Sequence, residues 1–381
     1  MNFFGTAVRR ASKMSILSMS SHTSYFTQTL VASMRKLYPE ALADKSFDNT
    51  GLLLEAPFDQ SRKQKNSVLL AIDLTTAVAD EAIGKQCSVV VAYHPIIFRG
   101  LKSLTSADTQ QRSLLRLAQH GISVYSPHTA VDTVPDGMAD WLCDVVTGSF
   151  KPNSTTQAVI NNCRSSLYTA PSFPEAPIPS VQASPQGPPH TRSTIHPSPP
   201  ASIPEGFESA GAGRLVTFNE AQPLTTLIDN VARGIGLPGG IPIALPQGRS
   251  VDDIQIKTVG MCPGSGSGVL LKGSGPIPDL LLTGEMSHHE ALAATERGSI
   301  VISLSHTNSE RGYLRSVMQP KLLQDLDQRW HACFDEASRD EKAKEGVSAV
   351  VKELYAGQGK VEVLVSVADR DPYGIMIWRG N

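Results

Sequence analysis

Histidine and carboxylate side chains follow three apolar, strand-like runs of this chain. The runs are Ser88–Pro95, Ile122–Asp132 and Ser299–Glu310. In an open α/β sheet, side chains at the carboxyl ends of parallel strands face a shared crevice. We therefore expect the groups at these strand ends to meet, namely His94, His128, Asp132, His306 and Glu310. Imidazoles and carboxylates without thiolates are typical ligands of a hydrolytic divalent-metal site.

Each of these histidine and carboxylate pairs, taken alone, could also have a purely structural role. His306 lies between a predicted buried strand and a predicted helix whose first turn holds Glu310, so both could reach one ion. Asp132 is a natural ligand or bridge for hard cations, and His128 would either bind an ion or orient a ligand. For an isolated pair, a hydrogen-bonded structural role is the more common outcome, and a histidine such as His94 usually belongs to the core. Three such strand ends in one chain favour a shared site.

Two further features could contact a substrate. His288 and His289 open a predicted helix, where adjacent side chains point about a hundred degrees apart and rarely bind one ion together. We interpret them as helix-start residues near the site, one of which could act as a general acid or contact a phosphate. The glycine-rich run Gly264–Gly268 could cradle phosphate, but it lacks a P-loop lysine, so a simple turn is the favoured interpretation.

Composition excludes several function classes. The formal net charge is −2 and charged residues make up 18%, so the chain has no basic field for direct nucleic-acid binding. The uninterrupted apolar stretches are too short to cross a membrane. The 5 cysteines are scattered without a CxxC pair, which favours inert thiols in a reducing compartment.

The first residues resemble a targeting segment. Residues 1–39 contain arginine, lysine and many serines but no acidic residue, as mitochondrial presequences do. The alternative is a disordered start, or initiation at Met14 or Met19, with a cytoplasmic and nuclear product. We lean toward a mitochondrial location.

Strands alternating with helices predict an α/β fold built as two interlinked lobes. We expect a leader or disordered segment over 1–23, a first α/β lobe over 24–150 and a second over 211–381, whose C-terminal segment returns to the first. Between them, 151–210 is predicted to be a disordered Pro/Ser-rich insertion. It includes Pro171–Pro204, where frequent prolines leave little apolar surface to bury. A protein partner could bind this insertion.

The predicted helices after the second site segment are long. One runs from Ser309 to Trp330 and should kink at Pro320, which has no backbone N–H. A charged helix over Ser338–Tyr355 and a strand over Val361–Val367 follow.

These segments together resemble the Nif-three-like family of dinuclear-metal-centre proteins (Ngg-one interacting factor three), as a eukaryotic and, we expect, fungal member. The similar segments, in family order, are FDNTGLLLE at Phe47, AIDLT at Ala71, YHPIIFRGLKSL at Tyr93, SPHTAVDTVPDGMADWL at Ser126, GAGR at Gly211, LLLTGEMSHHEAL at Leu280, SHTNSERGYL at Ser305 and VSVADRDP near the C-terminus. They cover nearly all of the sequence that we expect to fold.

The resemblance implies a two-lobed α/β subunit, a toroidal homohexamer and two divalent metals in an interior cleft. The family's ligands correspond to Tyr93 with His94, then Asp132, then His306 with Glu310. Tyr93 replaces a histidine, and a phenol with a pKa of about 10 is a poor ligand. We therefore expect one or two ions per subunit, the weaker relying on water or His128. Such ligands admit Zn, Mn, Fe, Co or Ni.

Three functions are compatible with these observations. The first is a metal-dependent hydrolase of a nucleotide or another phosphorylated small molecule, in line with the GTP cyclohydrolase label that some family members carry. The second is a non-enzymatic regulatory or interaction protein with structural metals, because eukaryotic family members have been linked to transcriptional partners. The third is metal storage or delivery.

Overall fold

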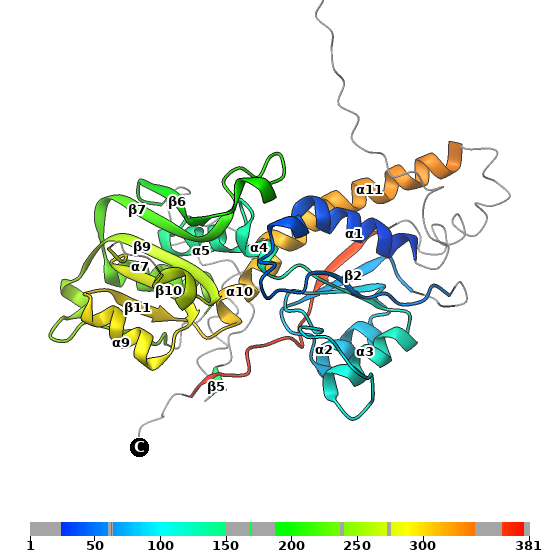
Figure 1. The fold of residues 1–381 in the computed structure, drawn as a ribbon, viewed down its shortest axis with the longest axis horizontal. Coiled ribbons are helices and arrows are strands. Elements are labelled where there is room, and N and C mark those ends of the chain that lie inside the picture. The colour runs from blue at the N-terminus through cyan, green and yellow to red at the C-terminus, as the bar shows by residue number, and fades with distance from the viewer. Residues whose placement is uncertain are drawn as a thin grey trace, which may run out of the picture.

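Two sheets flanked by helices form the two lobes of the protein (Figure 1). The computed structural model describes residues 24–59, 62, 64–149, 168–169, 187–236, 240–272, 276–339 and 360–376. One hydrophobic core cluster includes residues of both lobes, so the lobes are interlinked and the predicted α/β class is confirmed. No helix in these described ranges is long and apolar enough to cross a membrane.

The first sheet has the strand order β1-β4-β3-β2-β12. Its strands are β1 (Gly51–Leu54), β2 (Ser67–Ala71), β3 (Val89–Ala92), β4 (Ser123–Ser126) and β12 (Glu362–Val365). Only β1 pairs in the antiparallel sense; the other neighbours are parallel. The strands β2, β3 and β4 are buried at every position, as expected for a parallel sheet covered on both faces.

Helices cover both faces of this sheet. Alternate residues of β2 face opposite sides of the sheet. Val68 and Leu70 belong to one hydrophobic core cluster, whereas Leu69 belongs to a second cluster on the other face. The covering helices are α1 (Tyr25–Leu37) and α11 (Gln319–Arg339) on one side, and α2 (Thr76–Gly84) and α3 (Thr109–Gln119) on the other. In Figure 1, α1 and α11 lie side by side above the sheet.

The second sheet has the order β6-β7-β9-β10-β11-β8. Its strands are β6 (His190–Pro197), β7 (Gly211–Pro223), β8 (Ile243–Ala244), β9 (Gln255–Ser265), β10 (Leu280–Glu285) and β11 (Ile300–Ser303). The three strands β9, β10 and β11 are parallel, and the outer pairs are antiparallel. Its helices are α5 (Met138–Thr147), α7 (Leu224–Ile235), α8 (Ser267–Leu270) and α9 (His288–Glu296). Since α5 precedes the insertion but packs on β7 and β9, the chain exchanges elements between lobes.

The smaller elements connect these layers. They are α4 (Thr129–Thr133), α10 (Asn308–Tyr313), the short pair β5 (Tyr168–Thr169) and β13 (Ile375–Met376), the 3-10 turns η2 (Glu40–Leu42), η3 (Pro200–Ser202) and η4 (Val251–Asp253), and the π-helical turn η5 (Leu314–Met318). The turn η5 joins α10 to α11, immediately before Pro320. Pro320 has no backbone N–H to donate, and a kink was predicted there for that reason. The π-helical turn before it is wider than an α-helical turn and accommodates the lost hydrogen bond. The charged helix predicted beyond Arg339 lies outside the described residues.

The prediction of disorder over 151–210 is wrong for the described parts of this range, because β5 pairs with β13 and a longer strand lies near the end of the range. Part of 151–210 is the edge strand β6, which pairs along β7 from His190–Phe218 to Pro197–Gly211. Prolines lie just before β6 and at its end, but none lies in its centre. Because β6 is an edge strand, its backbone needs to hydrogen-bond to only one neighbouring strand. Its mostly exposed, polar side chains have the composition on which the prediction of disorder was based.

The segment that follows β12 fastens the two lobes together. The Asp369 carboxylate accepts a hydrogen bond from the Ile72 backbone N–H (2.7 Å) and lies 2.5 Å from the Arg311 guanidinium of α10. The Asp371 carboxylate accepts from the backbone N–H and hydroxyl of Thr307, at 3.0 and 2.9 Å. Because Ile72 follows β2 and Thr307 precedes α10, this segment fixes strand ends of both sheets.

Replacing Asp369 with asparagine should destabilise the fold strongly. The change leaves the guanidinium of Arg311, which is 3% exposed, without its buried carboxylate. Removing one partner of a buried ion pair costs roughly 3–5 kcal/mol, measured as the free energy of unfolding in urea. As a control, Glu362→Gln removes the exposed ion pair with Lys360 and should cost less than about 1 kcal/mol. Equal effects of the two substitutions would contradict this account.

Candidate metal centre

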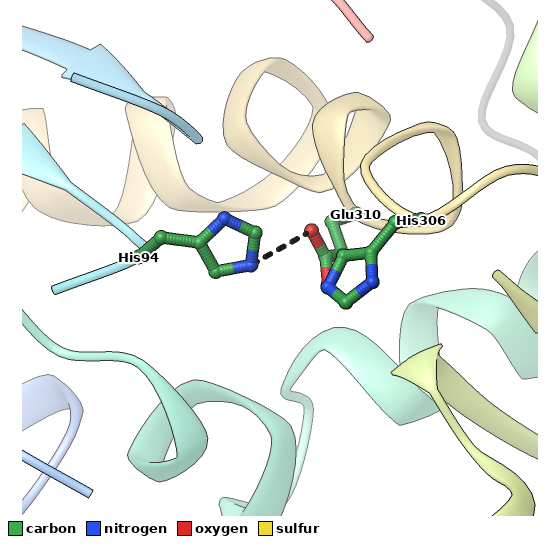
Figure 2. Close-up of side chains that lie close together, drawn as sticks. All are labelled: His94, His306 and Glu310. Carbon is green, nitrogen blue, oxygen red and sulfur yellow. Dashed lines mark ion pairs between the residues drawn. The ribbon is translucent and has the colours of Figure 1, made fainter. Parts of the chain in front are cut away.

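Three side chains from both lobes converge at the carboxyl ends of the strands. His94 follows β3, His306 follows β11 and Glu310 lies in the first turn of α10. Figure 2 shows the three pointing toward one another. Nε2 of His94 lies 3.5 Å from Oε2 of Glu310, and Nε2 of His306 lies 3.6 Å from Oε1 of the same carboxylate. All three ligand atoms lie within 4.8 Å of one another, so they could hold one cation.

A second carboxylate fixes the orientation of each of these imidazoles. Nδ1 of His94 lies 2.8 Å from Oδ1 of Asp73, and Nδ1 of His306 lies 2.9 Å from Oε1 of Glu285. A carboxylate at Nδ1 favours the tautomer that leaves Nε2 free to bind a metal. Sequence analysis did not assign Asp73 or Glu285 to the site. Their signal was position, because Asp73 follows β2 and Glu285 ends β10, and these strands are the neighbours of β3 and β11, which precede the two histidines.

The Glu310 carboxylate is the part of the site that most requires a cation. Glu310 is 1% exposed, and its Oε2 atom is buried without a hydrogen-bond partner. Buried polar atoms without partners are rare because they lose hydration without compensation. Two neutral imidazoles and one carboxylate suit Zn, Mn, Fe, Co or Ni. The residues present therefore fit a divalent cation.

Charges within the site also shift the pKa of His94. Burial alone would lower this pKa, but the negative charges of Glu310 and Asp73 outweigh burial and raise it to about 10. Without a metal, the His94 imidazole is thus protonated at neutral pH and neutralises Glu310. A divalent cation would replace this proton.

The end of β9 supplies the space for the site. Gly264 has a φ of +59°, and a Cβ added there would lie 2.7 Å from Oε1 of Glu310 and 3.0 Å from Nε2 of His306. The Gly264 N–H donates to Ser309 Oγ, and the Gly266 N–H donates to the Thr283 hydroxyl. Because these two N–H groups already donate hydrogen bonds within the protein, they are not available to bind a phosphate group. Gly264, which has no Cβ, allows the backbone to lie close to Glu310 and His306.

Asp132 and Tyr93 form a hydrogen-bonded pair beside this cluster. The Tyr93 hydroxyl donates to Oδ1 of Asp132 at 2.7 Å, and Arg214 of β7 holds the Asp132 segment through the Val134 carbonyl oxygen, at 3.1 Å. Burial, and then the negative charge of Asp132, raises the pKa of Tyr93 well above its usual range. Burial also raises the pKa of Asp132 to about 7, with the charge of Glu310 adding to the effect. Tyr93 is therefore a neutral donor at physiological pH.

His128 has a separate carboxylate partner. Its Nδ1 atom lies 2.7 Å from Oδ1 of Asp48, whose other oxygen accepts from the backbone N–H of Thr129. The His128 ring lies 5.6 Å from that of His94, between their centroids. His128 thus lines the site, although the three-residue cluster does not include it. Asp48 stands in the polar turn before β1, a turn that the sequence explains structurally first and as part of the site entrance second.

The adjacent pair His288 and His289 lies at the start of α9, and both side chains are exposed. Their rings contact each other, with centroids 5.2 Å apart. Glu285, which binds His306, stands three residues before His288. A catalytic role for either histidine stays a prediction.

The fold and the site define a two-lobed α/β protein with a candidate cation centre where the lobes meet. Residues 27–340 match the family described as Duf34/NIF3 (NGG1p interacting factor 3). The chain belongs to this family, and its similarity to yeast and animal relatives confirms that it is a eukaryotic member.

Relatives and solved structures cover most of the chain. The chain is 42% identical to "Protein NIF3 homolog" of Schizosaccharomyces pombe, over 76% of this chain and 86% of that one. It is 37% identical to "NGG1-interacting factor 3" of Saccharomyces cerevisiae, over 78% and 90%. Among solved structures, a Bacillus cereus protein related to NIF3 has a TM-score of 0.57 at 18% identity, over 91% and 98%. Reduced HcgD from Methanocaldococcus jannaschii has a TM-score of 0.51 at 16% identity, over 89% and 96%. These structures share the fold.

Replacing Gly264 with alanine should weaken metal binding. The new methyl group would displace Glu310 and His306 from their shared point, and the left-handed backbone adds strain. We expect Zn²⁺ affinity, measured by competition with a chromophoric chelator, to fall at least about tenfold, as for other changes that misplace ligands. Gly268→Ala is the matched control, because its nearest neighbour would be Lys272 Nζ at 3.8 Å. Unchanged affinity in folded Gly264→Ala would refute the assignment.

Metal binding should release protons at neutral pH. The His94 pKa of about 10 means that the metal-free imidazole is charged there, and a ligand nitrogen must be neutral. Zn²⁺ titrations by calorimetry in buffers of different ionisation enthalpy should give a release of about one proton or more at pH 7.5. The release should shrink as the pH rises through 10, where His94 is already neutral. Binding without proton release at pH 7.5 would show that His94 is not a ligand.

Proposed function

We propose that this protein is a divalent-metal-dependent hydrolase acting on a nucleotide or another phosphorylated small molecule. The observation that carries the proposal is the convergence of His94, His306 and Glu310, with one Glu310 oxygen buried and unsatisfied. Three protein ligands leave coordination positions open, which is typical of catalytic rather than structural sites. A divalent cation bound there would supply Lewis acidity and activate water near neutral pH.

The chain's own residues would orient the substrate and move a proton. His94 and His306, each fixed by a carboxylate at Nδ1, hold their Nε2 atoms toward the cation position. Burial raises the pKa of Asp132 to about 7, with a smaller contribution from the charge of Glu310, so Asp132 can accept a proton at neutral pH. The Tyr93 hydrogen bond fixes its position. Asp132 is therefore the general base that we propose.

Two exposed aromatic rings beside His128 support a ring-containing substrate. Phe47 and Phe98 are 51% and 45% exposed, with ring centroids 6.2 Å apart. Both pack edge-on against His128, at 6.3 and 6.4 Å. Large apolar side chains exposed together next to a polar site are typical of ligand-binding surfaces, and aromatic faces stack on planar rings. A nucleobase satisfies this geometry, while its phosphates would reach toward the cation.

The test is hydrolysis of a nucleotide panel by the full chain, with and without added Zn²⁺ or Mn²⁺. We expect cation-dependent turnover that Glu310→Gln abolishes, since amide oxygens are weaker ligands than carboxylates. Phe98→Ala should raise KM by about tenfold while leaving kcat within a factor of two or so, because it removes ring contacts and not chemistry. Phe98→Tyr, which keeps the aromatic face, is the control. No turnover by folded, metal-loaded protein across the panel would sink the hydrolase.

A regulatory or interaction role is the second candidate. The observation that favours it is the name of the Saccharomyces cerevisiae relative, "NGG1-interacting factor 3", at 37% identity. Deleting 170–186 would discriminate, because this range excludes both β5 and β6 and leaves their pairing with β13 and β7 intact. A hydrolase should keep its turnover in this deletion, whereas a partner that binds the Pro-rich segment should be lost.

A further inference from the structure

Two carboxylates lie at the candidate metal centre, and their oxygens have different partners in the structure. Oε2 of Glu310 is buried and accepts no hydrogen bond. Oδ1 of Asp132 accepts a 2.7 Å hydrogen bond from the Tyr93 hydroxyl. A buried acceptor without a partner costs free energy, whereas a bonded one does not. Of these two oxygens, only Oε2 of Glu310 lacks a hydrogen-bond donor. Its ion-pair partner is the His94 imidazole, with Nε2 at 3.5 Å, and a divalent cation would take the place of that partner.

The Tyr93 side chain is held where a ligand for another ion would stand. It is 2% exposed, and its ring lies 5.0 Å from the ring of His94 and 5.4 Å from that of His128. Its O–H is aimed at Asp132, so the phenolic hydrogen occupies one of the lone-pair directions of Oδ1 that a cation could use. A neutral O–H donor thus supplies the partial positive charge that this carboxylate needs.

Among the described residues, the other histidine, cysteine and carboxylate side chains do not form a second three-residue cluster. A stable site for a transition-metal ion normally needs at least three protein ligands. Within the described ranges, only His94, His306 and Glu310 bring three ligand atoms of histidine, cysteine or carboxylate side chains within 4.8 Å. Asp132 and His128 do not join this group, and Nδ1 of His128 is already bonded to Asp48.

We propose that this chain binds one divalent cation, held by His94, His306 and Glu310, and that the Tyr93 hydroxyl takes the place of a second cation on Asp132. The inference concerns the site of the proposed hydrolase. It is tested by counting bound metal without measuring turnover, so the two proposals can fail separately. It also assigns different roles to Glu310 and Asp132, which sequence pattern alone does not distinguish.

The first test compares two isosteric substitutions. Untagged full-length protein is stripped with a chelator, loaded with excess Zn²⁺, desalted and analysed by mass spectrometry for zinc per chain. We expect one zinc in the natural chain, none in Glu310→Gln and one in Asp132→Asn, because the asparagine oxygen still accepts from Tyr93. Two zinc ions in the natural chain, or loss of the ion in Asp132→Asn, would overturn the proposal.

The second test changes the phenol itself. Tyr93→His places an imidazole beside Asp132 and should raise the content to two zinc ions per chain. Tyr93→Phe removes the hydroxyl without adding a ligand and should stay at one, with circular dichroism confirming the fold of each variant. A folded Tyr93→His protein that still binds one ion would show that the phenol does not exclude the second. If that variant fails to fold, the natural chain and Asp132→Asn still decide the stoichiometry.

Discussion

The candidate metal centre depends on a carboxylate, Glu310, that is buried between two imidazoles. A buried anion is stable only with a positive partner, since the loss of hydration costs several kcal/mol. The metal-free chain provides that partner by protonating His94, which is why its pKa rises to about 10. A divalent cation is the stronger partner, because it also satisfies Oε2 and uses the Nε2 atoms of both histidines. The same group would account both for the proton held by the metal-free site and for the binding of a divalent cation there.

The fold holds this charge cluster together from several directions. His94 comes from the first lobe, whereas His306 and Glu310 come from the second, so neither lobe contains the site alone. The segment after β12 joins them, with Asp369 bridging the end of β2 to Arg311 in α10. Metal affinity and the stability of the contact between lobes should therefore be linked.

Much of the fold and the central ligands could be predicted from the sequence. The apolar runs of β3 and β11 are short, uninterrupted and followed directly by polar groups, so the positions of His94 and His306 at strand ends were readable. The histidine contacts of Asp73 and Asp48 were missed because each forms through tertiary structure, and no spacing along the chain reports it. The edge strand β6 was missed because its exposed face has the polar composition of the insertion.

Sequence spacing also could not distinguish Asp132 from Glu310. Both are acidic residues just after a histidine-bearing strand end, and the difference lies in what each oxygen contacts. The phenol of Tyr93 bonds to one, and the other is left unsatisfied in the described structure. Anomalous diffraction from zinc-loaded crystals, collected on both sides of the zinc edge, tests this most directly. The account predicts a single peak bonded to Nε2 of His94, Nε2 of His306 and the Glu310 carboxylate. A peak bonded to Asp132, or no peak among these three side chains, would contradict it.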